Sequence, residues 1–376
     1  MKPIGLYIHV PFCESKCPYC DFYSVKCDKE LIDRYTKATC EALKRYSQEM
    51  SLAFDTIYFG GGTPSLLGNE NIEKILKTVN ENFSFCAKEV TLEVNPTTAS
   101  TLDFKRLLSA GVNRLSIGVQ SAVDEELKQL GRRHTVRDAE RTIKMAQEGG
   151  FENISVDLMV AVPSQTKRSL LKSIDFCANQ NIQHISAYLL KIEENTPFYV
   201  QQTQLALKDD DEQAELYLHL VDELEKHGFK QYEISNFARE GYQGQHNLKY
   251  WNAEEYLGIG PSAHSFVNGK RLFYPRSLQD FLSGENEFIY DGDGGSVEEY
   301  LMLKLRLREG VNNNAFKERL GFDIPQVYFE RAKTYQKYGL IEVDEKSFRL
   351  TKKGLLMSNA LISNILVSEP LASAKT

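Results

Sequence analysis

The sequence has no long apolar run and no excess of positive charge. No segment approaches about eighteen unbroken apolar residues, so we expect no membrane-spanning helix. The first residues, MKPIGLYIHVPFC, hold no long apolar core of a secretory signal, which predicts a cytoplasmic protein with reduced thiols. The net charge of −7 and the pI of about 5.7 give no bulk attraction for nucleic acid, and we expect no such partner.

Solenoid repeats, low-complexity tracts and a disulfide framework are also missing. The seven cysteines are odd in number, and three of them cluster within residues 13–20, which argues against paired disulfides. The chain does have 376 residues, 42% of them hydrophobic. It can therefore bury a sizeable core, either as one large domain with a smaller one or as two domains of ordinary size.

In the first half, short apolar runs alternate with amphipathic stretches. The runs occupy residues 6–12, 56–61, 90–96, 114–120, 153–160 and 184–192. Helical patterns such as 30–50 and 138–150 lie between them, the second closed by glycines. This alternation predicts an α/β fold with a parallel sheet, either an incomplete (β/α)6 barrel or an open doubly wound sheet. Polar residues cluster at the C-terminal ends of the runs, where barrels carry their active sites, which favours the barrel.

Past residue 200 the rhythm changes. Residues 209–229 predict a helix whose acidic residues lie at its start, which suits the helix dipole. The stretch DGDGG, 291–295, is interpreted as a turn-rich linker; it is not a calcium loop, because Met302 stands where a bidentate Glu is needed. Helices and a small strand pair follow and resemble a winged-helix-like unit. We predict a partial barrel over 1–235, a connecting segment over 236–290 and a smaller α+β domain over 291–376.

A cysteine triplet with C-x₃-C-x₂-C spacing is the strongest chemical signal. Its members are Cys13, Cys17 and Cys20. Thiolates bind soft metals and iron–sulfur clusters. A structural zinc site needs four ligands, and the nearest further candidates, His9, Asp21 and Cys27, lack the paired spacing of zinc folds. Buried free cysteines are the other alternative. A cubane held by three thiolates leaves one iron free to bind a small molecule, which would explain the absence of a fourth nearby thiol.

The triplet and its place after the first strand resemble the radical SAM proteins. The opening LYIHVPFCESKCPYCDFYS is similar to their HemN/HemW branch, and the likeness runs over nearly the whole chain. The resemblance implies a [4Fe-4S] cluster on the three cysteines, with S-adenosylmethionine (SAM) on the open iron. It also implies SAM contacts from Tyr7, Gly61, Gly62, Thr63, Glu93, Gln120, Arg132 and Asp157. The glycines of FGGGTP let the backbone approach a ligand closely, and Arg132 is preferred to Arg133 on the spacing of the family pattern.

The HemN/HemW branch divides into two functions. Its oxygen-independent coproporphyrinogen III dehydrogenases use a 5′-deoxyadenosyl radical to convert two propionates to vinyl groups. Their motif is C-x₃-C-x₂-C-x-C after a long N-terminal arm, whereas here Phe22 stands at the last position and twelve residues precede Cys13. The HemW heme chaperones have C-x₃-C-x₂-C-x-F and a second signature, H-N-x-x-Y-W, which is complete at 246–251. We therefore predict a heme chaperone. The alternatives are the dehydrogenase of porphyrin and heme biosynthesis and a radical SAM enzyme acting on another tetrapyrrole.

The H-N-x-x-Y-W segment supplies a candidate heme ligand. A neutral imidazole is a common ligand of heme iron, and Tyr and Trp offer flat apolar surface, but the residues alone favour a structural role. The resemblance to the HemW proteins reverses this preference and makes His246 the predicted axial ligand, with Tyr250 and Trp251 beside it. The alternative makes His246 a capping or surface residue and Trp251 a core anchor. His264 in GPSAHS is a second candidate ligand. The resemblance implies delivery of heme to acceptor hemoproteins such as membrane-bound cytochromes, and it is compatible with peripheral attachment to a membrane and with a homodimer.

Overall fold

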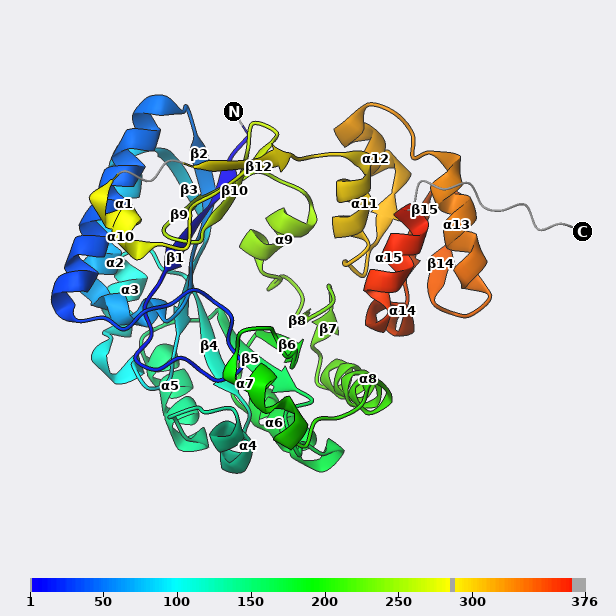
Figure 1. The fold of residues 1–376 in the computed structure, drawn as a ribbon, viewed down its shortest axis with the longest axis horizontal. Coiled ribbons are helices and arrows are strands. Elements are labelled where there is room, and N and C mark those ends of the chain that lie inside the picture. The colour runs from blue at the N-terminus through cyan, green and yellow to red at the C-terminus, as the bar shows by residue number, and fades with distance from the viewer. Residues whose placement is uncertain (1, 285–287, 367–376) are drawn as a thin grey trace, which may run out of the picture. The chain divides into compact units, whose positions relative to one another are not determined.

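The computed structural model describes residues 2–284 and 288–366, which fold into two compact units (Figure 1). The larger unit holds the described residues of Met1–Gln231, Ser235–Lys249 and Glu254–Gly294. The smaller unit holds those of Tyr232–Ile234, Tyr250–Ala253 and Gly295–Thr376. Short pieces near residues 232 and 250 therefore belong with the C-terminal part of the chain. The three-part division at residues 235 and 290 stays a prediction.

Six parallel strands form the centre of the larger unit. They are β1 (Ile4–Val10), β2 (Ala53–Gly61), β3 (Ser84–Val94), β4 (Arg114–Gln120), β5 (Ile154–Val160) and β6 (His184–Leu189). Each strand pairs with the next one along the chain. A doubly wound sheet reverses its strand order at a switch point. The consecutive order therefore confirms the incomplete (β/α)6 barrel.

Helices connect the strands and cover the outer face of the sheet (Figure 1). They are α1 (Lys29–Glu49), α2 (Gly68–Asn82), α3 (Phe104–Ser109), α4 (Asp124–Gln129), α5 (Val136–Glu148), α6 (Lys167–Asn179), α7 (Pro197–Gln201) and α8 (Asp210–Lys226). Short 3₁₀ turns lie at Pro64–Leu67, Ala99–Thr101 and Gln202–Gln204. The predicted helices begin at side-chain caps, for example Asp28 for α1 and a Thr135–Asp138 capping box for α5.

Short strands extend the sheet at both edges of the six-stranded core. Beside β6 lie the antiparallel strands β8 (Asn236–Ala238) and β7 (Lys230–Gln231). Beside β1, strand β9 (Tyr256–Ile259) runs parallel and is followed by antiparallel β10 (His264–Val267), β11 (Lys270–Phe273) and β12 (Ile289–Asp293). Helices α9 (Gln245–Trp251) and α10 (Leu278–Ser283) lie in the same stretch of chain. Sequence reasoning missed these strands because each is five residues or shorter.

The predicted linker at 291–295 is partly wrong, because Asp291–Asp293 belongs to β12. Leu272 of β11 pairs with Tyr290 and Arg271 pairs with Gly292, so Asp291 is an extra residue in the strand. Gly292 has a φ of 111°, which suits a bulge of this kind. Glycine-rich composition is common to turns and bulges, so the composition alone could not separate them.

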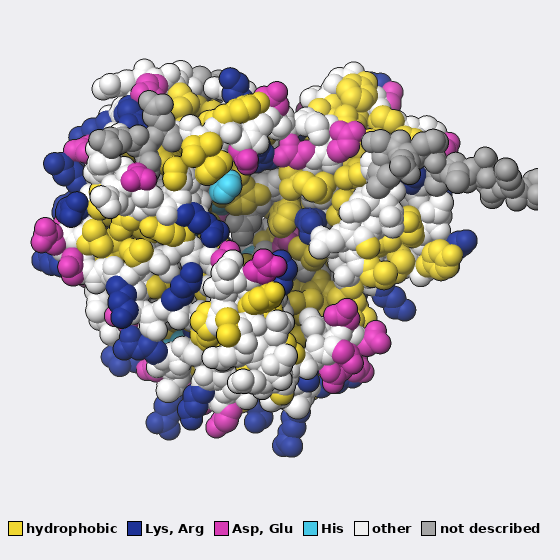
Figure 2. Space-filling view, in the orientation of Figure 1, with side chains coloured by type: hydrophobic (Ala, Val, Ile, Leu, Met, Phe, Trp, Pro, Cys, Tyr) yellow, Lys and Arg dark blue, Asp and Glu magenta, His cyan; other side chains and the backbone are white. Residues whose placement is uncertain are grey.

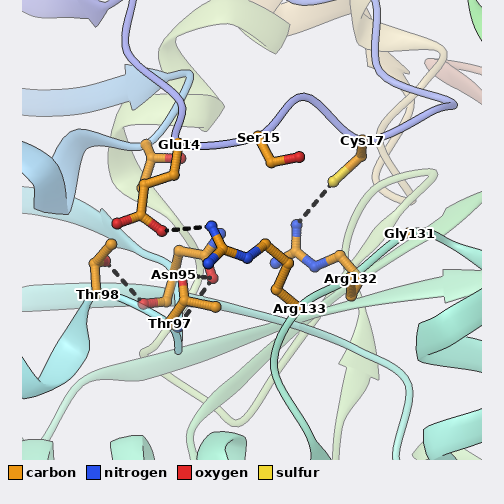
Figure 3. Close-up of a pocket in the computed structure, with 10 residues that line it drawn as sticks. Glu14, Ser15, Cys17, Asn95, Thr97, Thr98, Gly131, Arg132 and Arg133 are labelled. Atoms are coloured by element: carbon orange, nitrogen blue, oxygen red, sulfur yellow. Dashed lines mark hydrogen bonds and ion pairs between the residues drawn. The ribbon is translucent and has the colours of Figure 1, made fainter. Parts of the chain in front are cut away.

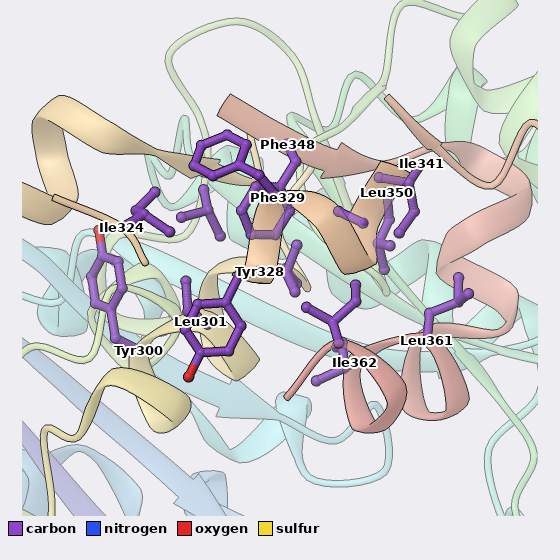
Figure 4. Packing of buried hydrophobic residues seen from close by; sticks show 14 of the residues in the cluster. Tyr300, Leu301, Ile324, Tyr328, Phe329, Ile341, Phe348, Leu350, Leu361 and Ile362 are labelled. Carbon is purple, nitrogen blue, oxygen red and sulfur yellow. The ribbon is translucent and has the colours of Figure 1, made fainter. Parts of the chain in front are cut away.

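The smaller unit has the element order of a winged helix. After Gly295 come α11 (Val297–Lys304), β13 (Val311–Asn312), α12 (Asn313–Leu320), α13 (Gln326–Gln336), β14 (Ile341–Val343), β15 (Ser347–Leu350), α14 (Lys352–Leu356) and α15 (Ser358–Leu366). The three strands form an antiparallel sheet in the order β13-β15-β14. Its core is a cluster that includes Leu301, Phe329 and Phe348 (Figure 4). This arrangement agrees with the predicted winged-helix-like unit.

The surface is rich in charge. Figure 2 shows Lys and Arg side chains around the outer rim of the larger unit, over helices such as α1 and α5, whose apolar sides face the sheet. Within residues 2–284 and 288–366, no helix is both long enough and apolar enough to cross a bilayer.

Candidate cofactor site

The three cysteines lie on a loop that begins at the C-terminal end of β1. The two ends of this loop are held together by an isolated parallel bridge between Phe12 and Val25. The Cys13 amide donates to the Val25 carbonyl at 3.0 Å, and the Val25 amide donates to the Pro11 carbonyl at 2.8 Å. The Cys20 amide donates to the Cys17 carbonyl at 3.1 Å, which forms a tight turn inside the loop. The backbone thus presents three thiols from one short, closed segment.

The thiols fit the donor set of an iron–sulfur cluster. All three are unpaired and partly exposed. Burial raises the pKa of the Cys20 thiol, and the neighbouring Cys17 and Cys13 raise it further, so the three sulfurs lie within electrostatic reach of one another. Among the described residues, no three His, Cys, Asp or Glu side chains converge as ligands of a single ion. Thiolates of a cubane each bind a different iron and need not converge on one point. The residues present therefore fit a cluster on three cysteines.

The FGGGTP turn follows β2 and packs against the start of the cysteine loop. A Cβ added to Gly62 would lie 2.5 Å from the Phe12 carbonyl oxygen, so only glycine fits this approach. The Gly62 amide donates to the Val10 carbonyl at 2.8 Å. Thr63 is buried, and its hydroxyl lies 3.5 Å from the Cys13 sulfur. Of the predicted SAM contacts on this turn, Thr63 thus lies next to a cysteine, and Gly62 packs against the residue that precedes it.

Two buried carboxyl groups, Glu93 near the end of β3 and Asp157 in the middle of β5, lie within electrostatic reach of each other. Tyr58 donates to Glu93 Oε1 at 2.8 Å, and Ser116 donates to Asp157 Oδ1 at 3.0 Å. Burial and, after it, the charge of Asp157 raise the pKa of Glu93 to about 8, against the opposing effect of the Tyr58 hydrogen bond. Burial also raises the pKa of Asp157. Glu93 can therefore carry a proton at neutral pH and can donate as well as accept a hydrogen bond.

Arg132 links the strand-end residues to the cysteine loop. Its Nη1 donates to Cys17 Sγ at 3.5 Å, and its Nη2 donates to the Gly118 carbonyl at 2.9 Å. The Gln120 side-chain amide also approaches Gly118: a Cβ added there would lie 3.0 Å from Gln120 Nε2. Gln120 ends β4 and has a left-handed backbone, with a φ of 68°. Arg133 differs from its neighbour because it is exposed and pairs with Glu14 at 3.1 Å. Arg132 thus reaches a cysteine sulfur directly, and its choice over Arg133 as a SAM contact stays a prediction.

These elements border a small polar pocket, shown in Figure 3. The cysteine loop contributes Glu14, Ser15 and Cys17 on one side of the pocket. The opposite side is formed by Asn95, Thr97, Thr98, Gly131, Arg132 and Arg133, and Thr63 completes the lining. Amide and hydroxyl groups here can bind an amino acid moiety beside the cysteines.

Sequence reasoning missed the role of His9. Its Nε2 lies 3.1 Å from the Tyr23 carbonyl and its Nδ1 lies 3.0 Å from the Tyr7 hydroxyl. A carbonyl only accepts, so Nε2 carries the proton and Nδ1 accepts from Tyr7. Burial lowers the pKa of His9 to about 4, which keeps the ring neutral. His9 therefore joins the predicted SAM contact Tyr7 to the far end of the cysteine loop. Its position four residues before Cys13 was the only sequence signal.

The predicted heme ligand His246 lies elsewhere, at the N-terminal ends of the strands. It has no exposed surface, its Nδ1 lies 2.9 Å from the Thr56 hydroxyl, and its ring stacks on Tyr58 with centroids 5.4 Å apart. Burial lowers its pKa to about 3. Thr56 is near the start of β2, whereas the cysteines follow the end of β1. The axial-ligand role of His246 stays a prediction.

The fold and the three-cysteine loop together define a radical SAM protein. The Radical SAM superfamily model matches residues 7–177, and the HemN C-terminal domain model matches residues 296–357. The chain is 35% identical to the heme chaperone HemW of Bacillus subtilis over 96% of this chain and 98% of that one. It is 31% identical to the HemW of Lactococcus lactis over 98% of each chain. The chain belongs to the HemW family.

Two further likenesses agree with this assignment. The mitochondrial radical S-adenosyl methionine domain-containing protein 1 of Bos taurus is 33% identical over 96% of this chain and 87% of its own. The structure of coproporphyrinogen III oxidase (HemN) from Escherichia coli superposes with a TM-score of 0.81 and 21% identity over 96% of this chain and 90% of that one. At that identity the second likeness concerns the fold alone.

Proposed function

We propose that this chain is a heme chaperone that holds a [4Fe-4S] cluster and SAM, binds heme and passes it to acceptor hemoproteins. The observation that carries the proposal is nearly full-length similarity to proteins named heme chaperone HemW. It is supported by Phe22, which is 64% exposed at the position where the dehydrogenase motif has its extra cysteine. No thiol at that position is available to the chemistry of the dehydrogenases.

The residues that would hold the cluster in this proposal are Cys13, Cys17 and Cys20, which would leave one iron free for SAM. A cluster of this kind supplies single electrons to the sulfonium of SAM. The chain's own residues hold and orient these groups. Arg132 keeps the Cys17 sulfur in place, and Gly62 admits the turn that carries Thr63 up to Cys13.

Four further residues complete the SAM site in this proposal: Tyr7, Glu93, Gln120 and Asp157. Tyr7 donates to neutral His9, which fixes its ring beside the cluster loop. Glu93, with its pKa near 8, offers an O–H donor, and Asp157 offers an acceptor. A pair of unequal carboxyl groups suits a ligand that carries both an amino group and hydroxyl groups.

The setting of the chaperone is also a proposal. Reduced cysteine ligands suit the cytoplasm, where thiols stay unpaired. The recipients are respiratory hemoproteins, including membrane-bound cytochromes reached by peripheral attachment, and the chain acts alone or as a homodimer.

The test is anaerobic reconstitution of the cluster, followed by two parallel assays. One sample receives SAM, a reductant and coproporphyrinogen III, and its porphyrins are separated by chromatography. The other is titrated with heme, with the Soret band and the fluorescence of Trp251, the single tryptophan, as readouts. Heme binding without loss of propionates is expected. Conversion to protoporphyrinogen IX would establish the dehydrogenase instead.

A pair of cysteine variants makes this test specific. Cys17→Ser removes a proposed cluster ligand, whereas Cys86→Ser changes an exposed free cysteine on β3. We expect Cys17→Ser to lose iron and sulfide and Cys86→Ser to retain both. Equal iron contents in the two variants would contradict the assignment of the cluster ligands.

A further inference from the structure

The direction of β9 places the two candidate heme ligands, His246 and His264, at opposite edges of the sheet. Strand β9 runs parallel to β1, with Gly5 beside Tyr256 and Ile8 beside Ile259. The chain before β9 therefore lies at the N-terminal edge of the sheet, and the chain after β9 lies at the C-terminal edge. His246 precedes β9, so it is at the edge opposite to the cysteine loop.

His264 follows β9 and is at the cysteine edge. The chain that continues from it contacts the cysteine loop at two points. Arg276 pairs with Asp21 at 3.4 Å, and the Leu278 amide donates to the Tyr23 hydroxyl at 3.0 Å. His264 is also among the groups whose charge acts on the pKa of His9. An exposed imidazole thus lies on the same side of the sheet as the proposed cluster.

His264 is the first member of a row that crosses three antiparallel strands. In the register of the sheet, His264 of β10 pairs with Phe273 of β11, and Phe273 pairs with Ile289 of β12. Directly opposed residues point to the same face of a sheet. The row spans two interstrand spacings, about 10 Å. His264 is exposed, Ile289 is 45% exposed, and Phe273 lies between them partly covered. The row therefore places an exposed imidazole, a partly covered aromatic ring and a half-exposed aliphatic side chain on one face of the sheet.

The orientation of the imidazole suits an axial ligand. The His264 and Phe273 rings are 5.5 Å apart and nearly parallel, at 27°. A porphyrin whose iron is bound by an imidazole nitrogen lies roughly perpendicular to the imidazole ring. Because the His264 and Phe273 rings are nearly parallel, a porphyrin on His264 would cross the edges of both rings and cover Ile289. Burial lowers the pKa of His264, which favours the neutral form that binds iron.

Positive charge flanks the row. Arg271 is two residues before Phe273 on β11 and therefore points to the same face; its guanidinium lies over the Phe266 ring at 4.2 Å. Arg276 lies on the other side, where it already pairs with a carboxylate. Both lower the pKa of His264 and are thus within electrostatic reach of it, as is the carboxylate of Asp291 on β12, which acts in the opposite direction. Two guanidinium groups beside an apolar surface match the two propionates of heme.

We propose that heme binds on the His264–Phe273–Ile289 row, with His264 as the axial ligand and Arg271 and Arg276 as partners of the propionates. This proposal rests on the proposed heme-binding function and specifies its site. It places heme at the cysteine edge of the sheet and leaves His246 as a buried residue that holds helix α9 on the barrel.

The experiment compares three glutamine variants of the cluster-loaded protein: His264→Gln, His246→Gln and His227→Gln. His227 is an exposed histidine next to the C-terminal end of α8 and serves as the matched control. Each protein is titrated with heme, and the coordination of the iron is read by resonance Raman and electron paramagnetic resonance spectra. We expect His264→Gln to weaken heme binding by about tenfold or more and to lose the imidazole signature. The other two variants should retain it.

Further variants separate ligation from packing. Added imidazole should restore the lost signature to His264→Ala, because the free base can occupy the vacated position. Arg271→Gln should weaken binding of heme but not of its dimethyl ester, which has no propionate charge. If the wild type binds heme and His264→Gln keeps the same affinity and spectrum, the site is wrong and the chaperone function stands. If the wild type binds no heme, both are wrong.

Discussion

The contact between Gly62 and Phe12 offers the sharpest structural test of the cofactor site. In Gly62→Ala, the new Cβ would lie 2.5 Å from the Phe12 carbonyl oxygen and 3.0 Å from its carbonyl carbon. Favourable contacts between such atoms begin near 3.5 Å, so the backbones of residues 12 and 62 must move apart by about 0.5 to 1 Å. Phe12 cannot retreat freely, since its side chain has no exposed surface and packs edge-on against Tyr35 at 5.2 Å.

The displacement is transmitted to a cluster ligand, because Cys13 follows Phe12 directly. Overpacking of this kind typically destabilises a protein by about 1 to 3 kcal/mol. We expect urea unfolding of apo Gly62→Ala to show a loss in that range. We also expect reduced iron and sulfide content after anaerobic reconstitution, with weaker SAM binding by the remaining cluster.

A second glycine separates loss of stability from loss of the site. Gly149, just after helix α5, has an ordinary φ of −73°, and a Cβ there would clash with the side chain of Phe104. Gly149→Ala should be destabilised to a similar degree but should load its cluster like the wild type. If Gly62→Ala also loads a full cluster and binds SAM normally, the inferred role of this close approach is refuted.

Three other substitutions test separate parts of the larger unit. Lys249→Met removes the ammonium group that pairs with the buried Asp55 at 2.8 Å. Urea unfolding should show a free energy of unfolding lower by about 3 kcal/mol, which is the low end for a broken buried pair, because Lys88 still pairs with Asp55. Arg132→Leu removes the hydrogen-bond donor to the Cys17 sulfur, so the reduction potential of the cluster should fall by several tens of millivolts. About 1 kcal/mol of lost hydrogen bonding corresponds to roughly 40 mV for one electron. An unchanged reduction potential in a redox titration would exclude this role. Glu93 has a pKa of about 8 in the folded protein against an ordinary value of 4.5. Between pH 4.5 and 8, unfolding therefore releases a proton from Glu93, so the free energy of unfolding falls as the pH rises through this range. Apo Glu93→Gln should lose this fall, which amounts to at most about 1.4 kcal/mol per pH unit, and parallel stability curves from about pH 5 to 8 would contradict the shift.

The parts of the site that are local in sequence could be predicted, and those that depend on tertiary contacts could not. The cysteine spacing and the polar residues that end the strands are readable because parallel strands bring their C-terminal ends to one edge. The partners of these residues lie far away in the chain. Arg132 meets Cys17 across 115 positions, and Tyr58 meets Glu93 across 35. No periodicity in the sequence encodes such pairings.

The fold shows the same division between strong and weak signals. The six long strands and the helices between them follow from apolar runs and amphipathic periodicity, and both are confirmed. Strands β9 to β12 were missed because four- and five-residue strands leave almost no periodic pattern. The glycines of 291–295 then made a bulged strand look like a linker.

The H-N-x-x-Y-W signature shows why chemistry inferred from residue type needs a position in the fold. A histidine beside Tyr and Trp is chemically suited to heme, yet His246 and Lys249 are both buried against the first strands. Glu89 accepts from the backbone amide of His246 at 3.1 Å, and Lys249 pairs with Asp55. These contacts hold helix α9 on the barrel. Residues used in this way are required for the fold whether or not a ligand binds. The exposed His264, by contrast, can change its partner at little cost to the fold, and that freedom is what a chaperone that must release its heme needs from a ligand.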